Sequence, residues 1–582
     1  MVKCYQKDYP RPQFVREEWF SLDGKWRFCF DDENIGEQKE YYKKFPENAA
    51  AIVVPYAYET PASGIKDGDI HGIMWYQRTF KTGRIGKEKK LLLNFEGVDY
   101  RAKVWLNGVF VGGHEGGYCR FTIDGSNAIR ENAENILTVR CEDKNLPIQV
   151  RGKQRWEEKS FGCWYVQTTG IYKSVWMEYV GETYLTALKI TPSLKDNTVR
   201  FDASVSQPGE DVEVRFDISF RGKHVQAVGI SAADVENSVS VRLDSHSLTY
   251  QVEQWSVENP VLYDVDITVY KNGRETDRAG SYFGLREFVA KDGKLLLNNV
   301  PFYARMILDQ GYWPDTGITP PDEAALVKDI ELAKSMGFNG FRKHQKVEDE
   351  RALYYADIMG FVVWCELPSN HWSSDIASVQ IAAEWLEIVR QNYNHPSLVA
   401  WVIFNESWGV RNIYTNERQS NLATGLYYLT KSIDSMRPVV SNDGWMHAES
   451  DILTLHHYEQ DGKKLYSFYD NFEKLVKGAS GNPQYQPFAQ GYTYRGQPII
   501  MSEFGGTAYV RDEGSGWGYG NGVKSDEEFL ERFGGLIEAV QKMSISGYCY
   551  TQLTDVEQEV NGLLRADRTA KIVPEKIAEH NR

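Results

Sequence analysis

The sequence is poor in cysteine and has no cysteine pattern that would build a cross-linked or metal-bound framework. Its seven cysteines are scattered, and neither a Cys-x-x-Cys pair nor a Cys/His metal spacing occurs. Scattered cysteines of this kind are typical of reduced, buried thiols. Residues 1–8 also lack the apolar segment of a secretory signal. We therefore expect a cytoplasmic protein that needs no disulfide bonds.

Long apolar runs and an excess of positive charge are missing as well. No apolar stretch reaches about 18 residues, the length of a membrane-spanning helix, so we expect no membrane partner. The formal net charge of −15 argues against the basic face that a nucleic-acid partner requires. No internal repeat or low-complexity segment occurs. A chain of 582 residues is instead long enough for several globular domains.

The N-terminal half has the pattern of β-sandwiches. In residues 1–182, short alternating runs are separated by Gly, Asn and Asp, which predicts a jelly-roll sandwich. Asn107-Gly108 lies between two such runs and is the strongest short-range signal of a hairpin. Residues 183–285 alternate more weakly, for example in 212–218, and their length fits an immunoglobulin-like spacer.

From residue 286 the pattern changes to alternating strands and helices, which indicates a parallel α/β architecture. Thr319 precedes two prolines and a helical run that ends near Gly337, so Thr319 is a candidate helix cap. Residues 286–582 suffice for a complete (β/α)₈ TIM barrel, which we predict as the third domain. Its expected strands include residues 338–342, 361–367, 399–404, 451–456, 499–502 and 547–552.

Two apolar stretches of this third region each lead into a glutamate. One continues as Asn405-Glu406-Ser407-Trp408 and the other as Ser502-Glu503. Either glutamate alone would most simply begin a solvated loop. In a (β/α)₈ barrel, however, the C-terminal strand ends form the catalytic face, so the two carboxylates should face each other there. Paired carboxylates in that position indicate glycoside hydrolysis.

With these motifs in this order, the sequence resembles glycoside hydrolase family 2, which contains β-galactosidases, β-glucuronidases and β-mannosidases. The resemblance covers essentially the whole chain and implies the sandwich, spacer and barrel order described above. It also implies that Glu406 is the acid/base and Glu503 the nucleophile of a retaining mechanism. The motifs that carry the resemblance are Trp105–Gly108 with His114–Tyr118, Gly170–Trp176, Phe404–Trp408 and Ser502–Gly505.

Several residues around these motifs are candidates for sugar binding. By the resemblance, Asn405 matches the residue that binds the sugar 2-hydroxyl, and Tyr458 matches a tyrosine that hydrogen-bonds the nucleophile. His457 either lines the pocket or belongs to the core. Asp309, at the end of the first barrel strand, either accepts hydrogen bonds from distal sugar hydroxyls or caps a turn. Candidate stacking platforms, or else core residues, are Trp372, Trp408 and Trp517.

A basic segment after the second barrel strand allows two interpretations. Arg342, Lys343 and His344 stand together, with Lys346 two residues later, whereas the family pattern has small residues between its Arg and His. The segment is either a solvated loop with Arg342 tied to a catalytic carboxylate, or a cationic pocket for a sugar carboxylate. In such a pocket Arg would bind through two nitrogens and Lys as a point charge.

Two family features are absent. β-Glucuronidases of the family carry an Asn-x-Lys pair after the last strand region, and neither Glu559–Arg565 nor Gly520–Lys524 reproduces it. The β-galactosidase metal site uses a Glu and a His two residues later, but Glu366 is followed by Leu367 and Pro368. The sequence therefore disfavours an ordinary glucuronidase, and we predict no catalytic metal and no cofactor.

Together these observations predict a retaining exo-β-glycosidase that acts on a small glycoside. The sugar that it removes is expected to have the galacto configuration, as a β-D-galacturonide or a β-D-galactoside. β-Glucuronidase, β-mannosidase and α-L-arabinosidase activities are the alternatives within the family, and a carbohydrate-binding protein without turnover is the alternative outside enzymes. A homo-oligomer is an expectation from the resemblance alone.

Overall fold

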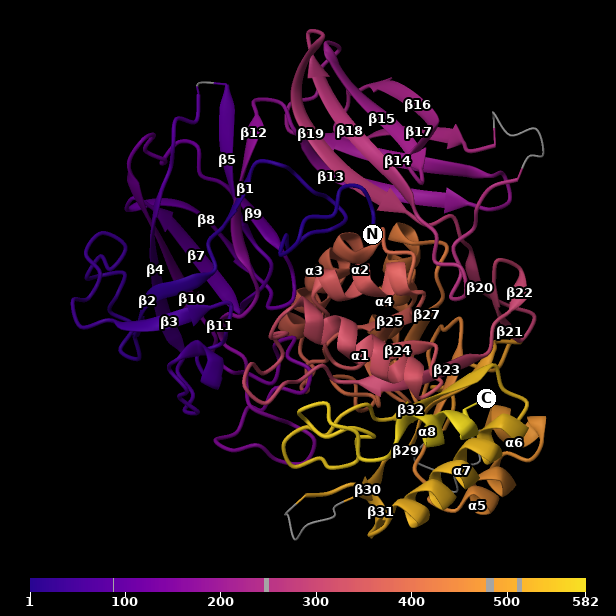
Figure 1. Ribbon diagram of the computed structural model, residues 1–582. Coiled ribbons are helices and arrows are strands. Elements are labelled where there is room, and N and C mark those ends of the chain that lie inside the picture. The colour runs from indigo at the N-terminus through magenta and orange to yellow at the C-terminus, as the bar shows by residue number, and fades with distance from the viewer. Residues whose placement is uncertain (87, 245–250, 478–485, 510–515, 582) are drawn as a thin grey trace.

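Two β-sandwiches and a barrel make up the molecule (Figure 1). The structure is a computed structural model that describes residues 1–86, 88–244, 251–477, 486–509 and 516–581. In Figure 1 the first sandwich lies at the left, the second at the top and the barrel at the lower right. Among the described residues, no helix combines the length and the apolar character needed to cross a membrane.

The first sandwich packs a four-stranded sheet, in the order β1-β12-β5-β9, against a six-stranded sheet, in the order β3-β2-β4-β10-β7-β8. Inward-facing residues of both sheets form one apolar core. Asn107 and Gly108 have φ angles of 53° and 80° and join β7 to β8, as the dipeptide predicts. The elements are β1 (Trp19–Ser21), β2 (Gly24–Phe30), β3 (Ala50–Val54), η1 (Pro61–Ser63), β4 (Ile73–Lys81), β5 (Lys89–Phe95), β6 (Val98–Asp99), β7 (Arg101–Leu106), β8 (Val109–Glu115), β9 (Phe121–Asp124), β10 (Glu134–Glu142), β11 (Gly170–Ile171) and β12 (Val175–Gly181).

The second sandwich is smaller and consists of antiparallel sheets in the orders β13-β14-β17 and β16-β15-β18-β19. Alternate apolar residues of both sheets meet in a separate core. A three-stranded sheet, β20-β21-β22, then leads into the barrel. These strands are β13 (Leu185–Ser193), β14 (Thr198–Val205), β15 (Val212–Phe220), β16 (Lys223–Ser231), β17 (Asn237–Arg242), β18 (Tyr263–Lys271), β19 (Arg274–Phe283), β20 (Phe288–Lys291), β21 (Lys294–Leu297) and β22 (Val300–Pro301).

The barrel has eight parallel strands in the order β27-β26-β25-β24-β23-β32-β29-β28, and the ring closes where β27 lies beside β28. The sequence analysis did not single out β27. The strands are β23 (Ala304–Asp309), β24 (Gly340–Lys343), β25 (Val362–Glu366), β26 (Leu398–Asn405), β27 (Val439–Asp443), β28 (Leu453–His457), β29 (Ile499–Gly505) and β32 (Gly547–Thr551), with the short pair β30 (Thr507–Tyr509) and β31 (Tyr519–Val523) beyond β29.

Helices cover the outside of the barrel. The first of them is capped by Asp322, whose side chain accepts a hydrogen bond from Ala325 N at 2.8 Å. The expectation that Thr319 caps it is wrong, because the Thr319 hydroxyl donates to Tyr172 O. The helices are α1 (Glu323–Ser335), α2 (Glu350–Met359), α3 (Asp375–Asn392), α4 (Glu417–Ile433), α5 (Gly462–Phe468), α6 (Phe472–Lys477), α7 (Asp526–Lys542) and α8 (Pro574–His580).

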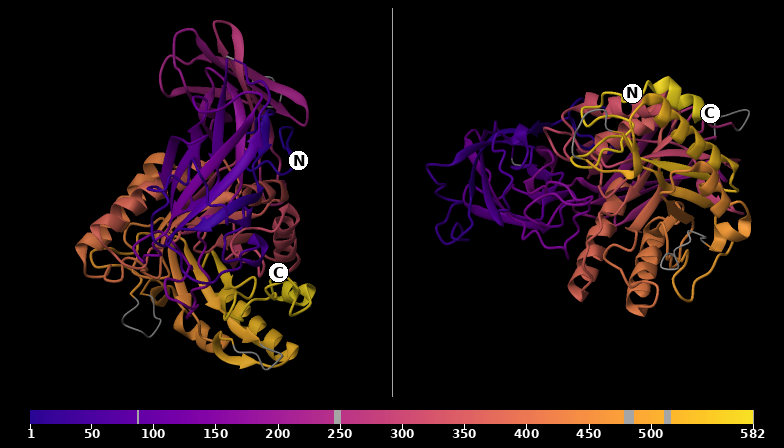
Figure 2. Two further views of the ribbon diagram at one scale, coloured as in Figure 1. Left: turned by 90° about the vertical axis from the view of Figure 1, so that its left-hand side faces the viewer. Right: turned by 90° about the horizontal axis from the view of Figure 1, so that it is seen from below.

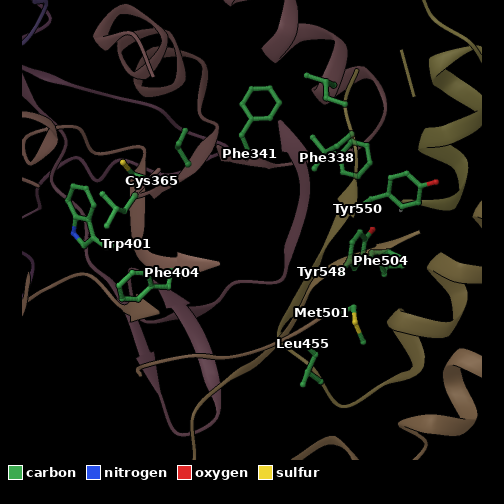
Figure 3. Close-up of a cluster of buried hydrophobic side chains, with 14 of the residues drawn as sticks. Phe338, Phe341, Cys365, Trp401, Phe404, Leu455, Met501, Phe504, Tyr548 and Tyr550 are labelled. Atoms are coloured by element: carbon green, nitrogen blue, oxygen red, sulfur yellow. The ribbon is translucent and has the colours of Figure 1, made fainter. Parts of the chain in front are cut away.

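Alternation along each barrel strand separates two apolar layers. Met306, Trp364 and Cys549 belong to the cluster inside the barrel. Phe341 and Tyr548 belong to the larger cluster between strands and helices, part of which is drawn in Figure 3. Because neighbouring residues of a strand point to opposite faces, a shift of one position decides whether a polar side chain reaches the interior or the helix layer.

The first sandwich reaches the C-terminal end of the barrel through the segment between β10 and β11. Gly152 in this segment donates from its backbone to Ser369 O at 2.9 Å, next to strand β25 of the barrel. A Cβ at Gly152 would lie 2.2 Å from Gln345 O, so only glycine fits there with its φ of 61°. Figure 2 shows the first sandwich extending to one side of the barrel.

Candidate active site

The two predicted catalytic glutamates lie together at the C-terminal ends of their strands. Glu406 directly follows β26, and Glu503 belongs to β29. His456 Nδ1 is 2.9 Å from Glu406 Oε1 and 3.5 Å from Glu503 Oε2. One oxygen of each carboxylate and one nitrogen of His456 lie within 4.8 Å of one another. This upper limit on the distance between one oxygen of each carboxylate agrees with the roughly 5–5.5 Å separation of retaining glycosidases better than with the roughly 6.5–9.5 Å of inverting ones.

Glu503 is held as a carboxylate. Its Oε1 accepts a hydrogen bond from Arg342 Nη1 at 2.8 Å, and its Oε2 accepts one from the Tyr458 hydroxyl at 2.5 Å. Burial alone would raise its pKa, but the positive charges of His456 and Arg342 outweigh burial and lower the pKa of Glu503 to about 2. An ionised and oriented carboxylate is what a nucleophile requires.

Glu406 is in a more open position. Its side chain is 23% exposed, compared with 6% for Glu503. Glu406 and Ser407 have φ angles of 50° and 61°, so two successive non-glycine residues adopt the left-handed conformation. Such backbone strain is found mostly at functional sites. Hydrogen bonds from Glu406 N to Asp443 O and from Ser407 N to Asn442 Oδ1, at 3.0 and 2.9 Å, hold the turn.

Arg342 is the structural centre of the site. Its fully buried guanidinium contacts Glu366 at 2.8 Å, Asp443 at 2.7 Å and Glu503 at 2.8 Å, and it donates to Asn405 Oδ1 at 2.8 Å. Three carboxylates already neutralise this cation. Arg342 is thus tied to a catalytic carboxylate, as the first interpretation of the basic segment expects, and is not part of a pocket for a sugar carboxylate. The solvated loop of that interpretation is wrong, because Arg342–Lys346 are all buried.

Lys343 and Asp309 are not at the site, which corrects the prediction for Lys343. Asp309 instead takes its turn-capping alternative, because its Oδ1 accepts a hydrogen bond from Gly311 N at 2.9 Å. Lys343 and Asp309 form an ion pair with each other, and Lys343 also contacts Glu348 at 2.7 Å. Lys343 stands two residues after Phe341, whose ring packs in the helix layer, and its ammonium lies 4.8 Å from that ring. Their strand positions thus direct both side chains away from the barrel interior. Lys346 is likewise paired with Glu348, at 3.0 Å.

The histidine at the site is His456, and of the two alternatives for His457 the structure favours packing away from the pocket. His456 is buried, and its Nε2 lies 2.8 Å from Asp443 Oδ2. His457 points the other way, towards α5, where its Nδ1 lies 3.0 Å from the Tyr469 hydroxyl. The sequence offered two adjacent histidines on a buried strand, and only the alternation of the strand distinguishes them.

Other predicted residues are brought to the site. Asn405 is fixed by Arg342, and His344 Nδ1 lies 3.1 Å from Glu366. The rings of Trp408 and His344 are 6.3 Å apart. Tyr458 stacks on Tyr519 with a centroid distance of 3.4 Å, so Tyr519 is a neighbour of the nucleophile that the sequence analysis missed.

The remaining two tryptophans lie further out. Trp517 is half-buried, packs edge-on against Tyr519 at 5.7 Å, and donates from its indole to Gly162 O at 2.9 Å. Trp372 is 56% exposed and borders a groove of about 350 Å³ with Arg411 and Asn412. Trp517 thus packs beside the tyrosine that stacks on Tyr458, whereas Trp372 lies on an exposed groove.

The first sandwich contributes side chains that the sequence analysis did not consider. Tyr165 donates to Glu559, and Trp164 lies 5.4 Å from Trp408. The ammonium of Lys153 lies 5.2 Å from the centre of the Trp408 ring. No sequence motif marks these residues, because their place at the site depends on one domain packing against another.

Glu406, His456 and Glu503 are residue types that bind metals, but their arrangement is a poor metal site. Burial would lower the pKa of His456, yet the carboxylates of Glu503 and Asp443 raise it to about 10. A protonated imidazole has no lone pair to offer, and both nitrogens already contact carboxylates. The three residues are therefore better described as an acid–cation–acid cluster.

Models of known protein families match three consecutive segments of the chain, and all three belong to the same family. Residues 19–178 match the model of "Glycosyl hydrolases family 2, sugar binding domain", residues 183–286 that of "Glycosyl hydrolases family 2", and residues 288–572 that of "Glycosyl hydrolases family 2, TIM barrel domain".

Relatives with curated names are distant. A beta-glucuronidase of Streptococcus agalactiae is 26% identical over 414 residues, which are 66% of this chain and 66% of the relative, just under two thirds. A beta-galactosidase of Thermoanaerobacter pseudethanolicus is 24% identical, and the match covers 86% of this chain and 67% of the relative. A beta-galacturonidase structure from Eisenbergiella tayi, bound to galacturonate, shares the fold with a TM-score of 0.75 and 20% identity, covering 100% of this chain and 99% of its own.

Proposed function

Because the chain belongs to glycosyl hydrolases family 2, we infer that it is a retaining exo-β-glycosidase that removes a terminal galacto-configured sugar, as a β-D-galacturonide or a β-D-galactoside. The observation that carries the mechanism is the approach of Glu406 and Glu503, with carboxylate oxygens within 4.8 Å. This spacing leaves room for one sugar carbon between nucleophile and acid, but not for an additional water.

The reaction proceeds in two displacements. A carboxylate oxygen of Glu503 forms a bond to the anomeric carbon, while the bond from that carbon to the leaving oxygen breaks and Glu406 gives this oxygen a proton. Water then attacks the anomeric carbon of the glycosyl-enzyme, Glu406 takes its proton, and the Glu503 carboxylate leaves. Two inversions return the sugar with its original β configuration.

The surrounding side chains keep Glu503 ionised and orient Asn405. Arg342, His456 and Tyr458 stabilise the negative charge of Glu503 before attack and after the sugar leaves. Arg342 also fixes the oxygen of Asn405, which leaves the amide nitrogen of Asn405 to donate to the sugar 2-hydroxyl. A hydrogen bond there strengthens as positive charge develops on the ring in the transition state.

Fewer observations support the choice of sugar than support the mechanism. The stretch Glu559–Arg565 has no Asn-x-Lys pair, and its one asparagine, Asn561, is buried and bonded to Gln552 and Glu559. This arrangement supports a sugar other than an ordinary glucuronide. β-Glucuronide remains the principal alternative, since the relatives include proteins named beta-glucuronidase. β-Mannoside and α-L-arabinoside are the others.

The test measures nitrophenol release from the β-galactoside, β-galacturonide, β-glucuronide and β-mannoside, with the first-formed anomer of the product identified by NMR. We expect a β product, and a loss of kcat of at least about a thousandfold in Glu503→Gln. Glu459→Gln is the matched control, because Glu459 caps its own loop by accepting from Gln460 N at 2.8 Å. An α product, or unchanged turnover in Glu503→Gln, would contradict the mechanism, and sugar binding without turnover would indicate a binding protein.

A further inference from the structure

One buried cation at the catalytic end of the barrel has no carboxylate bonded to it. Lys153 is 6% exposed, and within the described part of the chain no Asp or Glu oxygen lies at ion-pair distance from its Nζ. The thiol of Cys163 is its hydrogen-bonding neighbour. By contrast, Arg342, Lys343 and Lys346 are all paired with carboxylates. An unpaired buried ammonium is costly unless something else provides a negative charge.

The surroundings of Lys153 direct it towards the reacting groups. Its ammonium lies 5.2 Å from the centre of the Trp408 ring and 5.9 Å from that of Tyr165. Burial would lower the pKa of Lys153, but Cys163, Glu559 and the two catalytic glutamates are close enough to raise it above the usual value. Lys153 therefore carries a full positive charge at neutral pH.

The backbone on both sides of Lys153 is anchored. Gly152 is in close contact with Gln345 O, where no side chain fits, and its amide bonds Ser369 O at 2.9 Å. On the other side, the Gln154 side chain donates to Asp99 Oδ2 at 2.8 Å and accepts from Thr168 N at 2.8 Å. The barrel thus fixes one neighbour and the first sandwich the other, so the ammonium is pre-positioned rather than free to move.

We propose that Lys153 binds the carboxylate of a uronic-acid substrate and so selects uronides over neutral glycosides. This inference rests on the proposed glycosidase function and assigns its carboxylate receptor to the first sandwich rather than to the basic segment Arg342–Lys346. A uronate carboxylate would give the ammonium the partner that it lacks, and the rings of Trp408 and Tyr165 would exclude water from the pair. A neutral sugar would leave Lys153 buried without an anion.

The competing explanation is that Lys153 only offsets the negative charge of Glu406, Glu503 and Glu559. The two roles differ in one measurable quantity, the ratio of kcat/KM for a β-D-galacturonide to kcat/KM for the matching β-D-galactoside. Loss of a general charge offset changes both substrates alike and leaves the ratio unchanged. Loss of a carboxylate receptor lowers the ratio.

The experiment compares this ratio in the wild type, Lys153→Met and Lys159→Met, with nitrophenyl glycosides of both sugars. Lys159 is an exposed lysine of the same segment and serves as the matched control. We expect the wild type to favour the uronide, and Lys153→Met to lower the ratio about 100-fold, as for a desolvated charge pair. A wild type that favours the galactoside, or an unchanged ratio in Lys153→Met, would overturn the proposal.

A binding measurement separates failure of this proposal from failure of the glycosidase function. Titration calorimetry with free D-galacturonate, and D-galactose as the neutral control, needs no turnover. We expect Lys153→Met to weaken galacturonate binding about 100-fold. If the wild type cleaves no glycoside but binds galacturonate more tightly than Lys153→Met does, the glycosidase proposal fails and the proposal that Lys153 binds the carboxylate stands. If both proteins bind galacturonate equally, the proposal for Lys153 is refuted. If Lys153→Met does not fold, Lys153→Gln, which retains a polar head without charge, replaces it.

Discussion

His456 is a single residue that connects the chemistry of the site with the stability of the barrel. It contacts Glu406 at 2.9 Å, Asp443 at 2.8 Å and Glu503 at 3.5 Å. Without a cation in this position, the three acidic side chains would repel one another. The raised pKa of His456, about 10, is the consequence of that arrangement, and it implies that the protonated imidazole is part of the folded structure.

The charge of His456 predicts a pH-dependent stability. Its pKa in the folded state, about 10, lies above the value of 6.5 of an unperturbed histidine. The stabilisation is therefore fully present below pH 6.5 and is lost as the pH rises towards 10. We expect the difference in melting temperature between the wild type and His456→Gln to narrow by a few degrees across that window.

His457→Gln is the control for this measurement. Burial lowers the pKa of His457, so this residue loses its proton at a lower pH than an unperturbed histidine does. Its melting temperature should follow that of the wild type in parallel from about pH 6.5 to about pH 10. If the curves of wild type and His456→Gln are also parallel, His456 is not a cation in the folded protein.

Individual strands determine which side chains meet at the site. The sequence allowed the barrel, the ends of most of its strands and the Glu406–Glu503 pair to be predicted, because apolar runs end where polar residues begin. It did not allow the facing of residues at those ends to be predicted. Where a strand is buried on both faces, apolar residues occupy both parities and the alternation leaves no trace in the sequence. For this reason Lys343 was placed at the site, and the alternatives for Asp309 and His457 could not be decided.

Irregular pairing adds to the difficulty. The register of β28 and β29 shifts between Leu455 and His456, so that His456 pairs with Glu503 rather than with Ser502. A similar irregularity follows Met501 where β29 pairs with β32. Such shifts turn a side chain from one face of the sheet to the other, and no residue type in these strands allows them to be predicted.

Because the two histidines of β28 point to opposite faces of the strand, we expect effects of very different size from their substitution. His457→Gln should retain kcat/KM within about threefold, because its ring packs against α5 and not against the glutamates. His456→Gln should lower kcat/KM by at least about 100-fold, because it removes the cation that stabilises ionised Glu503. Steady-state kinetics on the best nitrophenyl glycoside measure both, and comparable losses in the two variants would mean that the strand faces the other way.

At the level of the whole molecule, the catalytic end of the barrel depends on how the first sandwich docks. Tyr165 of the sandwich donates to Glu559 of the barrel, and Arg120 contacts Glu350 across the same interface. These partners are hundreds of residues apart in the sequence, so their meeting could not be predicted from local patterns. The sandwich is therefore part of the candidate site rather than an appendage to it.

The same interface contains a carboxyl that is costly to ionise. Glu384 on α3 is buried against the sandwich, where its Oε1 accepts a hydrogen bond from Tyr118 N at 2.9 Å. Burial is the main reason why the pKa of Glu384 is raised to about 8; backbone hydrogen bonds from Tyr118 and Gly117 oppose this rise, and the neighbouring acids Glu387 and Glu115 add to it. Glu384 is therefore protonated in the docked molecule at neutral pH, whereas in the unfolded chain it would be ionised.

Glu384→Gln tests how this proton contributes to docking. Because the folded pKa lies above the unperturbed 4.5, folding takes up a proton between pH 4.5 and about 8, and wild-type stability falls over that range. The neutral glutamine avoids this loss, so the variant should gain a few degrees in melting temperature over the wild type as the pH rises, with no further gain above about pH 8. Glu417→Gln, at the exposed start of α4, is the control and should keep a constant difference. A constant difference for Glu384→Gln as well would mean that Glu384 is ionised at the interface.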